Sequence, residues 1–409
     1  MKLWRLIEKF RRVWREGGLL IAIKRVFHFI GNLKGRKIRR EDIRNVKKNK
    51  GTILFINGCC VENPIRYRVL HQMEQLKEAG ISCAKIYSED IELEMEKNYQ
   101  LFIFYRCEYT ENIAEFIGRA KSHQKRVCFD IDDLITDTKY TNQLPFVQEF
   151  SLAYKKVFDT SVMLIGKTLS LCDIAIVTTE ALAEELGKVV QETYINRNTA
   201  SKEMVIYAEE ALKSPKYDSK YIWLGYFSGS LTHNKDFEII RPVLMRILEE
   251  YTQIGLILVG ELETSDEINR FGERIMKMGM TSWQELPKLI VRADVNLAPL
   301  EDTIFNRSKS EIKWIEAALV KVPTVASNIG AFKTMIEDGM TGILCENIED
   351  SWYKGICRII DDKTERLRIA ENAYKYVMSN CTTIGKCQEY ADFIQSQMLR
   401  SNNRIDEML

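Results

Sequence analysis

Short β-rich runs alternate with stretches of helical periodicity along most of this chain, and this alternation constrains the fold more than any other feature. A first group of runs lies at 52–57, 82–87, 101–105, 126–130, 173–178 and 193–196, and a second at 222–227, 255–260, 294–300, 323–327 and 342–345. Strand–helix alternation predicts a parallel sheet with helices on both faces. The polar segment Ser214–Ser219, which contains a proline, separates the two groups. We therefore predict an α/β protein with two consecutive Rossmann-like domains, which bind ligands where the strands end and the domains face each other.

The 409 residues are sufficient for two domains of ordinary size and for additional terminal segments. We place the first domain at 51–215 and the second at 216–385. Residues 1–50 are predicted to form a basic amphipathic arm. Residues 386–409 continue a helical pattern and are assigned to a C-terminal helix.

The arm concentrates positive charge and has an amphipathic pattern. Residues 1–50 contain 17 Lys and Arg against 4 Asp and Glu, although the whole chain has a formal net charge of only +1. One helical face collects the apolar side chains of Leu3, Leu6, Ile7, Phe10, Val13 and Trp14. Aromatic and aliphatic residues opposite Lys and Arg are typical of a helix on an anionic membrane surface. Packing on the protein's own core and binding to nucleic acid are the alternatives, and we predict membrane association through residues 1–40 and no nucleic-acid partner.

Cysteine and histidine usage predicts neither a disulfide framework nor a metal site. The ten cysteines include no C-x-x-C pair, and the four histidines are far apart in sequence. The N-terminus lacks an uninterrupted apolar core followed by a cleavage site of small residues. We expect a cytoplasmic protein, peripheral on the inner face of the cell membrane, without metal or cofactor.

Three aspartates, Asp130, Asp132 and Asp133, follow an apolar run in the stretch RVCFDIDDLITD. The D-x-D spacing is compatible with a divalent metal held against a nucleotide-sugar. The letters FDIDDL also resemble the nucleophile motif of haloacid-dehalogenase-type phosphatases. A third interpretation is an acidic wall of a cleft, in which the carboxylates hold hydroxyl groups or stabilise developing positive charge. Asp133 can alternatively cap the next helix.

Two stretches of the second domain contain candidate phosphate- and sugar-binding residues. In YFSGSLTHNKDFEII, Ser228, Gly229 and Ser230 allow a ligand to approach backbone N–H groups at a helix N-terminus, and His233 and Lys235 add cationic donors. In the 305–347 stretch, Lys309 is expected to open a helix with Glu316 two turns along the same face. A carboxylate there can accept two ribose hydroxyls, and a lysine can neutralise a diphosphate. The alternatives are a structural turn and solvated helix residues, respectively.

From about residue 51 to about residue 385 the chain resembles a bacterial member of glycosyltransferase family 4, which has the GT-B fold. The resemblance rests on the order and spacing of PIRYRVLHQMEQL, FDIDDLITD, CDIAIVTTEALAEEL, INRN, GYFSGSLTHNKDF, ELPKLIVRADVNLAPL and the 305–347 stretch. It is similar above all to enzymes of cell-surface polysaccharide assembly, including rhamnan-type synthesis proteins. The resemblance implies an acceptor domain followed by a nucleotide-sugar donor domain, with the C-terminal helix crossing back to the first domain.

The resemblance also implies roles for individual residues. Glu316 matches the second glutamate of the family's E-x7-E motif, which binds the donor ribose, whereas Ser308 stands where the first glutamate is expected. Lys309 and Ser310 resemble the Lys-Ser pair of this subgroup, and Lys309 is expected to face the donor phosphates.

Further correspondences concern both domains. His233 and Lys235 correspond loosely to the family's phosphate-binding basic pair. Gly58 matches the glycine loop of the first domain, with Arg66 and Arg68 as the basic residues beside it. In this interpretation Asp130, Asp132 and Asp133 point into the cleft. Asp130 or Asp132 is expected to act on the substrate.

The implied function is a retaining glycosyltransferase. It would move a hexose or deoxyhexose from a nucleoside diphosphate sugar to a lipid-linked or polysaccharide acceptor, without a bound metal. The metal interpretation of D-x-D belongs to a different glycosyltransferase fold, and the phosphatase interpretation requires further motifs. Because Ser308 interrupts E-x7-E, a catalytically silent subunit that binds a glycan or a partner is the alternative.

Overall fold

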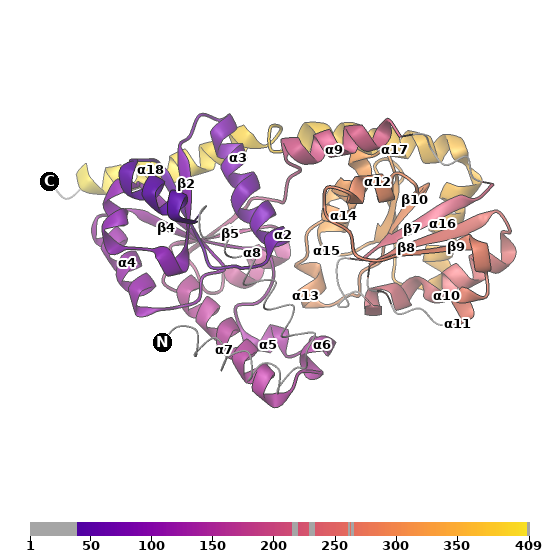
Figure 1. The fold of residues 1–409 in the computed structure, drawn as a ribbon, viewed down its shortest axis with the longest axis horizontal. Helices are drawn as coiled ribbons and strands as arrows, with labels where there is room; N and C mark the ends of the chain where they lie inside the picture. The colour runs from indigo at the N-terminus through magenta and orange to yellow at the C-terminus, as the bar shows by residue number, and fades with distance from the viewer. Residues whose placement is uncertain (1–38, 215–219, 229–233, 261, 263–265, 407–409) are drawn as a thin grey trace.

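Two parallel sheets of six strands each form the framework of the protein, and Figure 1 shows the two domains that they build side by side. The computed structural model describes residues 39–214, 220–228, 234–260, 262 and 266–406. Helices lie against both sheets, and the predicted pair of α/β domains is confirmed.

The first sheet has the strand order β2-β1-β3-β4-β5-β6. Its strands are β1 (Ile53–Asn57), β2 (Cys83–Tyr87), β3 (Leu101–Tyr105), β4 (Arg126–Ile131), β5 (Ile174–Val177) and β6 (Glu192–Ile195). The helices of this region are α2 (Glu62–Ile65), η1 (Arg66–Leu70), α3 (His71–Glu78), η2 (Ser88–Asp90), η3 (Leu93–Asn98), α4 (Glu111–Ser122), α5 (Thr138–Thr141), α6 (Pro145–Gln148), α7 (Leu152–Leu169) and α8 (Glu180–Leu186).

The second sheet has the order β12-β11-β10-β7-β8-β9. Its strands are β7 (Ile222–Phe227), β8 (Ile254–Val259), β9 (Ile275–Met278), β10 (Val295–Ala298), β11 (Thr324–Ser327) and β12 (Ile343–Cys345). The remaining helices are α9 (Lys202–Leu212), α10 (Asn234–Glu250), α11 (Asp266–Asn269), η5 (Gly272–Arg274), α12 (Leu286–Ile290), α13 (Ile304–Arg307), α14 (Ile312–Leu319), α15 (Gly330–Met335), α16 (Glu349–Asp361), α17 (Lys363–Asn380) and α18 (Cys387–Asp406).

Central strands are apolar on both faces because helices cover both sides of each sheet. All five residues of β1 and of β3 are buried, and their sequences, ILFIN and LFIFY, are almost continuously apolar. The edge strand β9 is different. Its sequence IMKM is only partly buried and includes an exposed lysine. This strand was not predicted, because so short a run with a lysine has too weak a hydrophobic pattern.

The chain crosses between the domains at two adjacent segments. Ala200 N–H donates to the Cys381 carbonyl at 2.8 Å, and Thr383 N–H donates to the Ala200 carbonyl at 2.9 Å. Helix α9 follows the first crossing and packs in the core of the second domain through Met204, Ala208 and Ala211. The boundary at 215/216 stays a prediction, although α9, which precedes it, packs with the second domain. The sequence suggested this position because Ser214–Ser219 is the more obvious polar break.

Both ends of the described chain pack on the first domain. Tyr390, Ala391 and Ile394 of α18 lie in the core formed by β1, β3 and β4, and Figure 1 shows α17 and α18 passing along one side of both domains. Residues 39–48 form a helix that buries Val46 in the same domain. This helix belongs to the first domain and not to a separate arm, whereas residues 1–38 lie outside the described part of the chain.

In the parts of the chain that the structure describes, none of the helices combines the length and hydrophobicity that a bilayer-spanning segment needs.

Candidate functional site between the domains

The two domains touch along a seam formed by segments that follow strands or begin helices. Tyr67 OH of the first domain donates to Glu316 Oε1 of the second at 2.9 Å. Asn198 Nδ2 donates to Ser310 Oγ at 2.9 Å, and Thr179 Oγ1 donates to the Ser308 carbonyl at 3.2 Å. The predicted donor-binding residues Ser310 and Glu316 therefore lie at the domain interface.

The π-helical turn η1 points the consecutive side chains of Arg66, Tyr67 and Arg68 toward different neighbours. Arg66 lies over the Tyr67 ring at 4.2 Å and over the Trp283 ring of the second domain at 4.4 Å. Tyr67 reaches Glu316, and Arg68 turns into the interior of its own domain. A π turn widens the angular spacing of side chains and is frequent at functional sites. Arg66 is only 6% exposed, and its Nε and Nη1 atoms have no hydrogen-bond partner among the described residues.

Asp130 and Arg68 form a buried ion pair inside the first domain. Arg68 donates through Nε and Nη2 to the two Asp130 oxygens, both at 2.8 Å, and Gln72 Nε2 adds a bond of 2.6 Å. Both side chains are fully buried. The prediction that Asp130 points into the cleft is wrong, and Arg68 does not face the cleft either. Burial raises the pKa of Asp130, and Arg68 opposes that shift. The buried ion pair joins η1 to β4 and therefore has a structural role.

Asp132 and Asp133 gather around Arg106 at the ends of β3 and β4. Arg106 Nε donates to Asp132 Oδ1 at 2.7 Å, and Tyr105 OH donates to the same oxygen at 3.0 Å. Arg106 Nη2 also bonds Asp133. Arg106 has a φ of 46°, a left-handed conformation that is uncommon outside glycine and often marks functional positions. Asp132 keeps 13% of its side chain exposed and Asp133 keeps 35%, so this cluster, unlike Asp130, reaches the surface.

Gly58 lies directly against this cluster. A Cβ atom at Gly58 would lie 2.5 Å from both the Arg106 carbonyl oxygen and Cys107 Cα. The loop after β1 can therefore pack on the loop after β3 only with glycine here. This contact explains the residue structurally, and its approach to a donor stays a prediction.

The loop after β7 is described only in part. Ser228 is buried, and its N–H donates to the Val259 carbonyl at 2.9 Å. Gly229, Ser230 and His233 lie outside the described residues. Lys235 is exposed in the first turn of α10.

Lys309 and Glu316 belong to a group of charges at the start of α14. This helix begins at Ile312, so Lys309 precedes it and does not open it as predicted. Lys309 lies over the Phe305 ring at 5.6 Å. Lys313, in the first turn of α14, interacts electrostatically with both Lys309 and Glu316. Burial raises the pKa of Glu316, while the hydrogen bond from Tyr67 and the charges of Arg66 and Lys313 lower it.

Three residues of this seam were not predicted, although their sequence positions carried signals. Lys313 follows Lys309 by four residues, Arg106 directly follows a buried strand, and Tyr67 stands between two arginines. Such signals are weak singly because exposed lysines and arginines occupy similar positions in any α/β protein.

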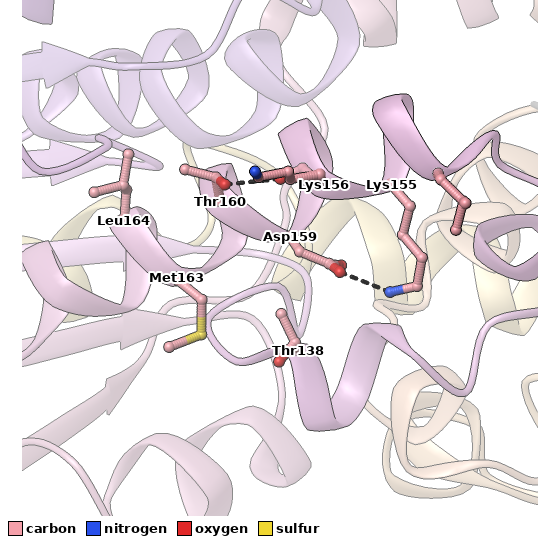
Figure 2. A pocket seen from close by; sticks show the side chains of 8 residues that line it. Thr138, Lys155, Lys156, Asp159, Thr160, Met163 and Leu164 are labelled. Atoms are coloured by element: carbon pink, nitrogen blue, oxygen red, sulfur yellow. Dashed lines mark hydrogen bonds and ion pairs between the residues drawn. The ribbon is translucent and has the colours of Figure 1, made fainter.

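A separate hollow of about 650 Å³ lies on α5 and α7, as Figure 2 shows. It is lined by Thr138, Leu152, Lys155, Lys156, Asp159, Thr160, Met163 and Leu164. None of the predicted site residues lines it. Lys155 pairs with Asp159 at 2.7 Å beside it.

Two parallel α/β domains with polar groups along their seam define the GT-B class of fold, and comparison with known structures confirms this class. A glycosyltransferase from Rickettsia africae is 14% identical, with a TM-score of 0.60, and the match covers 86% of this chain and 99% of that one. HepE from Anabaena, solved in complex with UDP, is 14% identical with a TM-score of 0.58 over 84% of this chain and 100% of that one. WaaG, a glycosyltransferase involved in lipopolysaccharide biosynthesis, is 14% identical with a TM-score of 0.50 over 84% of this chain and 99% of that one.

Residues 224–362 match the protein family described as "Glycosyl transferases group 1". This match lies within the second domain, and the fold of the whole described chain is of the GT-B class. No sequence among the curated proteins matches this chain.

Proposed function

We propose that the protein is a retaining glycosyltransferase of family 4, of the type that assembles bacterial surface polysaccharides, including rhamnans. It would transfer a hexose or deoxyhexose from a nucleoside diphosphate sugar to a lipid-linked or polysaccharide acceptor. The observation that carries this proposal is the seam itself. The domain that matches group 1 glycosyltransferases directs Glu316 to Tyr67 of the first domain, and Lys313 interacts electrostatically with both Glu316 and Lys309.

The donor fits the charges of this seam. Glu316 can accept hydroxyl groups of a ribose. Among the described residues its carboxylate accepts a hydrogen bond only from the neutral phenol of Tyr67, which a ligand can displace. The lysines suit a diphosphate. HepE, which shares the fold, was solved with UDP and with UDP-glucose, and this supports a nucleoside diphosphate sugar as the donor here.

The chemical step needs stabilisation of the leaving group more than a strong protein base. The bond between the anomeric carbon and the diphosphate oxygen breaks while the acceptor oxygen bonds the same face of the sugar. The leaving diphosphate takes the acceptor proton. Lys309 would stabilise the charge that develops on the diphosphate. Asp132, which Arg106 holds and which keeps part of its side chain exposed, would contact acceptor hydroxyls.

Location and metal dependence are further parts of the proposal. The basic arm would hold the enzyme on the inner face of the cell membrane, where lipid-linked acceptors are found. The reaction would proceed without a bound metal.

A thermal-shift screen with UDP, GDP, dTDP, CMP and ADP, with and without EDTA, tests donor binding. Stabilisation by one nucleoside diphosphate, unchanged by EDTA, is expected. A shift that disappears with EDTA would instead favour a metal at the aspartates, and the absence of any shift would contradict the proposed donor.

Replacing Glu316 with Ala tests the ribose assignment. We expect affinity for the stabilising nucleotide to fall on the order of 10-fold, because a charged hydrogen-bond acceptor is lost. Calorimetric titration measures this, with Glu371→Ala as the control, since Glu371 lies on α17 and pairs with Lys321 at 2.8 Å. Equal affinity in a folded Glu316 variant would refute the assignment.

A silent binding subunit is the second candidate, favoured by Ser308. This residue is buried, and its Oγ donates to the Ile304 carbonyl at 2.9 Å, so it does not replace a carboxylate functionally. Slow hydrolysis of the donor sugar by the purified protein distinguishes the two candidates, because a silent subunit releases no sugar.

A further inference from the structure

Lys313 is fixed in position by its backbone and by the aromatic ring beneath its side chain. Its main-chain carbonyl accepts a hydrogen bond of 3.3 Å from Asn296 Nδ2, and Asn296 is itself buried in β10 and bonded to Thr324. Its ammonium lies 5.0 Å from the centre of the Tyr226 ring, which belongs to β7. The lysine therefore sits over the carboxyl half of the central strands of the second sheet, where α/β folds bind ligands.

The charges around Lys313 leave its ammonium without a direct counter-ion. The groups that interact with it are Asp236 on α10, Lys309 on the preceding loop and Glu316 on its own helix. Asp236 Oδ1 already accepts from the Glu301 N–H at 2.8 Å and from Asn306 Nδ2 at 3.2 Å. Within the described residues, the ammonium makes no hydrogen bond or ion pair.

A half-buried ammonium in this situation is costly unless an anion joins it. Burial lowers the pKa of Lys313 to about 8, Asp236 and Glu316 raise it, and Lys309 lowers it. A bound diphosphate would supply the missing negative charge and raise the pKa again. Protonation of the lysine and binding of the anion are therefore coupled.

We infer that Lys313 is a donor-binding residue that contacts the diphosphate of the nucleotide-sugar and makes donor affinity depend on pH. The inference rests on the proposed function, because the anion is the donor diphosphate. It adds a residue between the two positions of the interrupted E-x7-E motif, four residues after Lys309. In this chain a lysine of α14 thus contributes to donor binding where Ser308 no longer contributes a carboxylate.

The expected direction follows from the protonation state. Below pH 8 the free protein carries a charged Lys313 and binds the diphosphate. Above pH 8 the lysine must first take up a proton, so affinity falls by about tenfold between pH 7 and pH 9. The charged groups that face Lys313 are Asp236, Lys309 and Glu316, and burial raises the pKa of Tyr226 well above its ordinary value of 10.

Calorimetric titration of the full-length protein with UDP, GDP and dTDP at pH 7 and pH 9 tests the inference. Lys313→Met should weaken binding on the order of 10- to 100-fold at pH 7 and remove the pH dependence. Lys313→Arg should retain binding and also lose the pH dependence, because arginine stays charged at both values. Lys354→Met, at an exposed lysine of α16, is the matched control and should behave like the wild type.

Each outcome decides between the alternatives. A wild type that binds a diphosphate, with a Lys313→Met variant that binds it equally well, overturns the inference and leaves the proposed function intact. A wild type that binds none of the three diphosphates overturns both. If Lys313→Met does not fold, the Lys313→Arg profile still decides, since an unchanged pH dependence in that variant refutes a role for Lys313.

Discussion

Asp130 and Glu316 are both carboxylates in the interior of the molecule, but their partners differ. Asp130 has a guanidinium bonded to both oxygens, whereas Glu316 accepts a hydrogen bond from the neutral hydroxyl of Tyr67. Separating a buried ion pair leaves both charges without a counter-ion. When a neutral phenol moves away from a carboxylate, no opposite charge is left unpaired. Glu316 can therefore exchange its partner for a ligand, and Asp130 is held in place.

Replacing Asp130 with Ala should lower the free energy of unfolding by about 3–5 kcal/mol, because Arg68 would remain buried without its counter-ion. Chemical denaturation measures the loss. Asp350→Ala is the control, since its pair with Lys354 is exposed and worth at most about 1 kcal/mol. An Asp130→Ala variant of native stability that no longer transfers sugar would instead support the catalytic role predicted from the sequence.

At the scale of elements, the strands were predictable because they are buried on both faces. Runs such as LFIFY and IWLGYF can be identified as strands from the sequence alone. A short, almost continuously apolar stretch predicts a parallel strand that is covered on both faces. The π turn of η1 was not predictable. It depends on where Arg66, Tyr67 and Arg68 find partners, and those partners lie on four different segments.

Helix α18 completes the core of a domain that is distant in sequence. Tyr390 OH donates to Gln72 Oε1 at 2.5 Å, and the Phe393 ring stacks on Tyr194 at 3.6 Å. The first domain should therefore be unstable without this helix.

Truncation after Lys386 is expected to abolish cooperative thermal unfolding of the first domain, because the apolar surface around β1 and β3 would be exposed to water. Differential scanning calorimetry measures this. Removal of residues 407–409 serves as the control. A truncated protein that retains both unfolding transitions would show that α18 is dispensable.

At the scale of the whole molecule, a buried carboxylate lies where the domains and the second crossing meet. Glu311 is fully buried, both of its oxygens lack a hydrogen bond among the described residues, and Arg197 Nη1 lies 3.7 Å away. Burial raises the pKa of Glu311 to about 7, and Arg197 opposes this shift. The folded protein therefore binds this proton more tightly than the unfolded chain does.

The stability associated with Glu311 is fully present below its ordinary pKa of 4.5 and is lost as pH rises through about 7. Glu311→Gln should consequently be more stable than the wild type at pH 8, by up to about 3 kcal/mol, and no more stable than it near pH 4.5. Melting temperatures of both proteins across this range measure the difference. Parallel curves would refute the assignment.

The basic N-terminal arm is predicted to hold the whole protein on a membrane surface. Deleting residues 1–38 should release the protein from vesicles that contain anionic lipid, because most of the clustered positive charge is removed. Co-sedimentation at low and high salt measures binding, and neutral vesicles are the control. Unchanged sedimentation of the deletion variant with anionic vesicles would contradict membrane association through the arm.

The sequence by itself determined the two α/β domains and the positions of most strands along the chain, and it predicted a region for the donor site. These properties depend on local hydrophobic patterning and on the rule that ligands bind at strand ends, both of which a single chain displays. Glu316 and Lys309 could be named for this reason, as could the loops that carry them.

Only the tertiary structure decided which charged residues form ion pairs inside the protein and which remain available to a ligand. The letters around Asp130 and Asp132 look alike, but one aspartate meets Arg68 inside the domain and the other meets Arg106 at its edge. The same holds for α9, which joins the second core despite preceding the polar break. Burial and ion pairing depend on neighbours from distant segments, and no local pattern in the sequence records those neighbours.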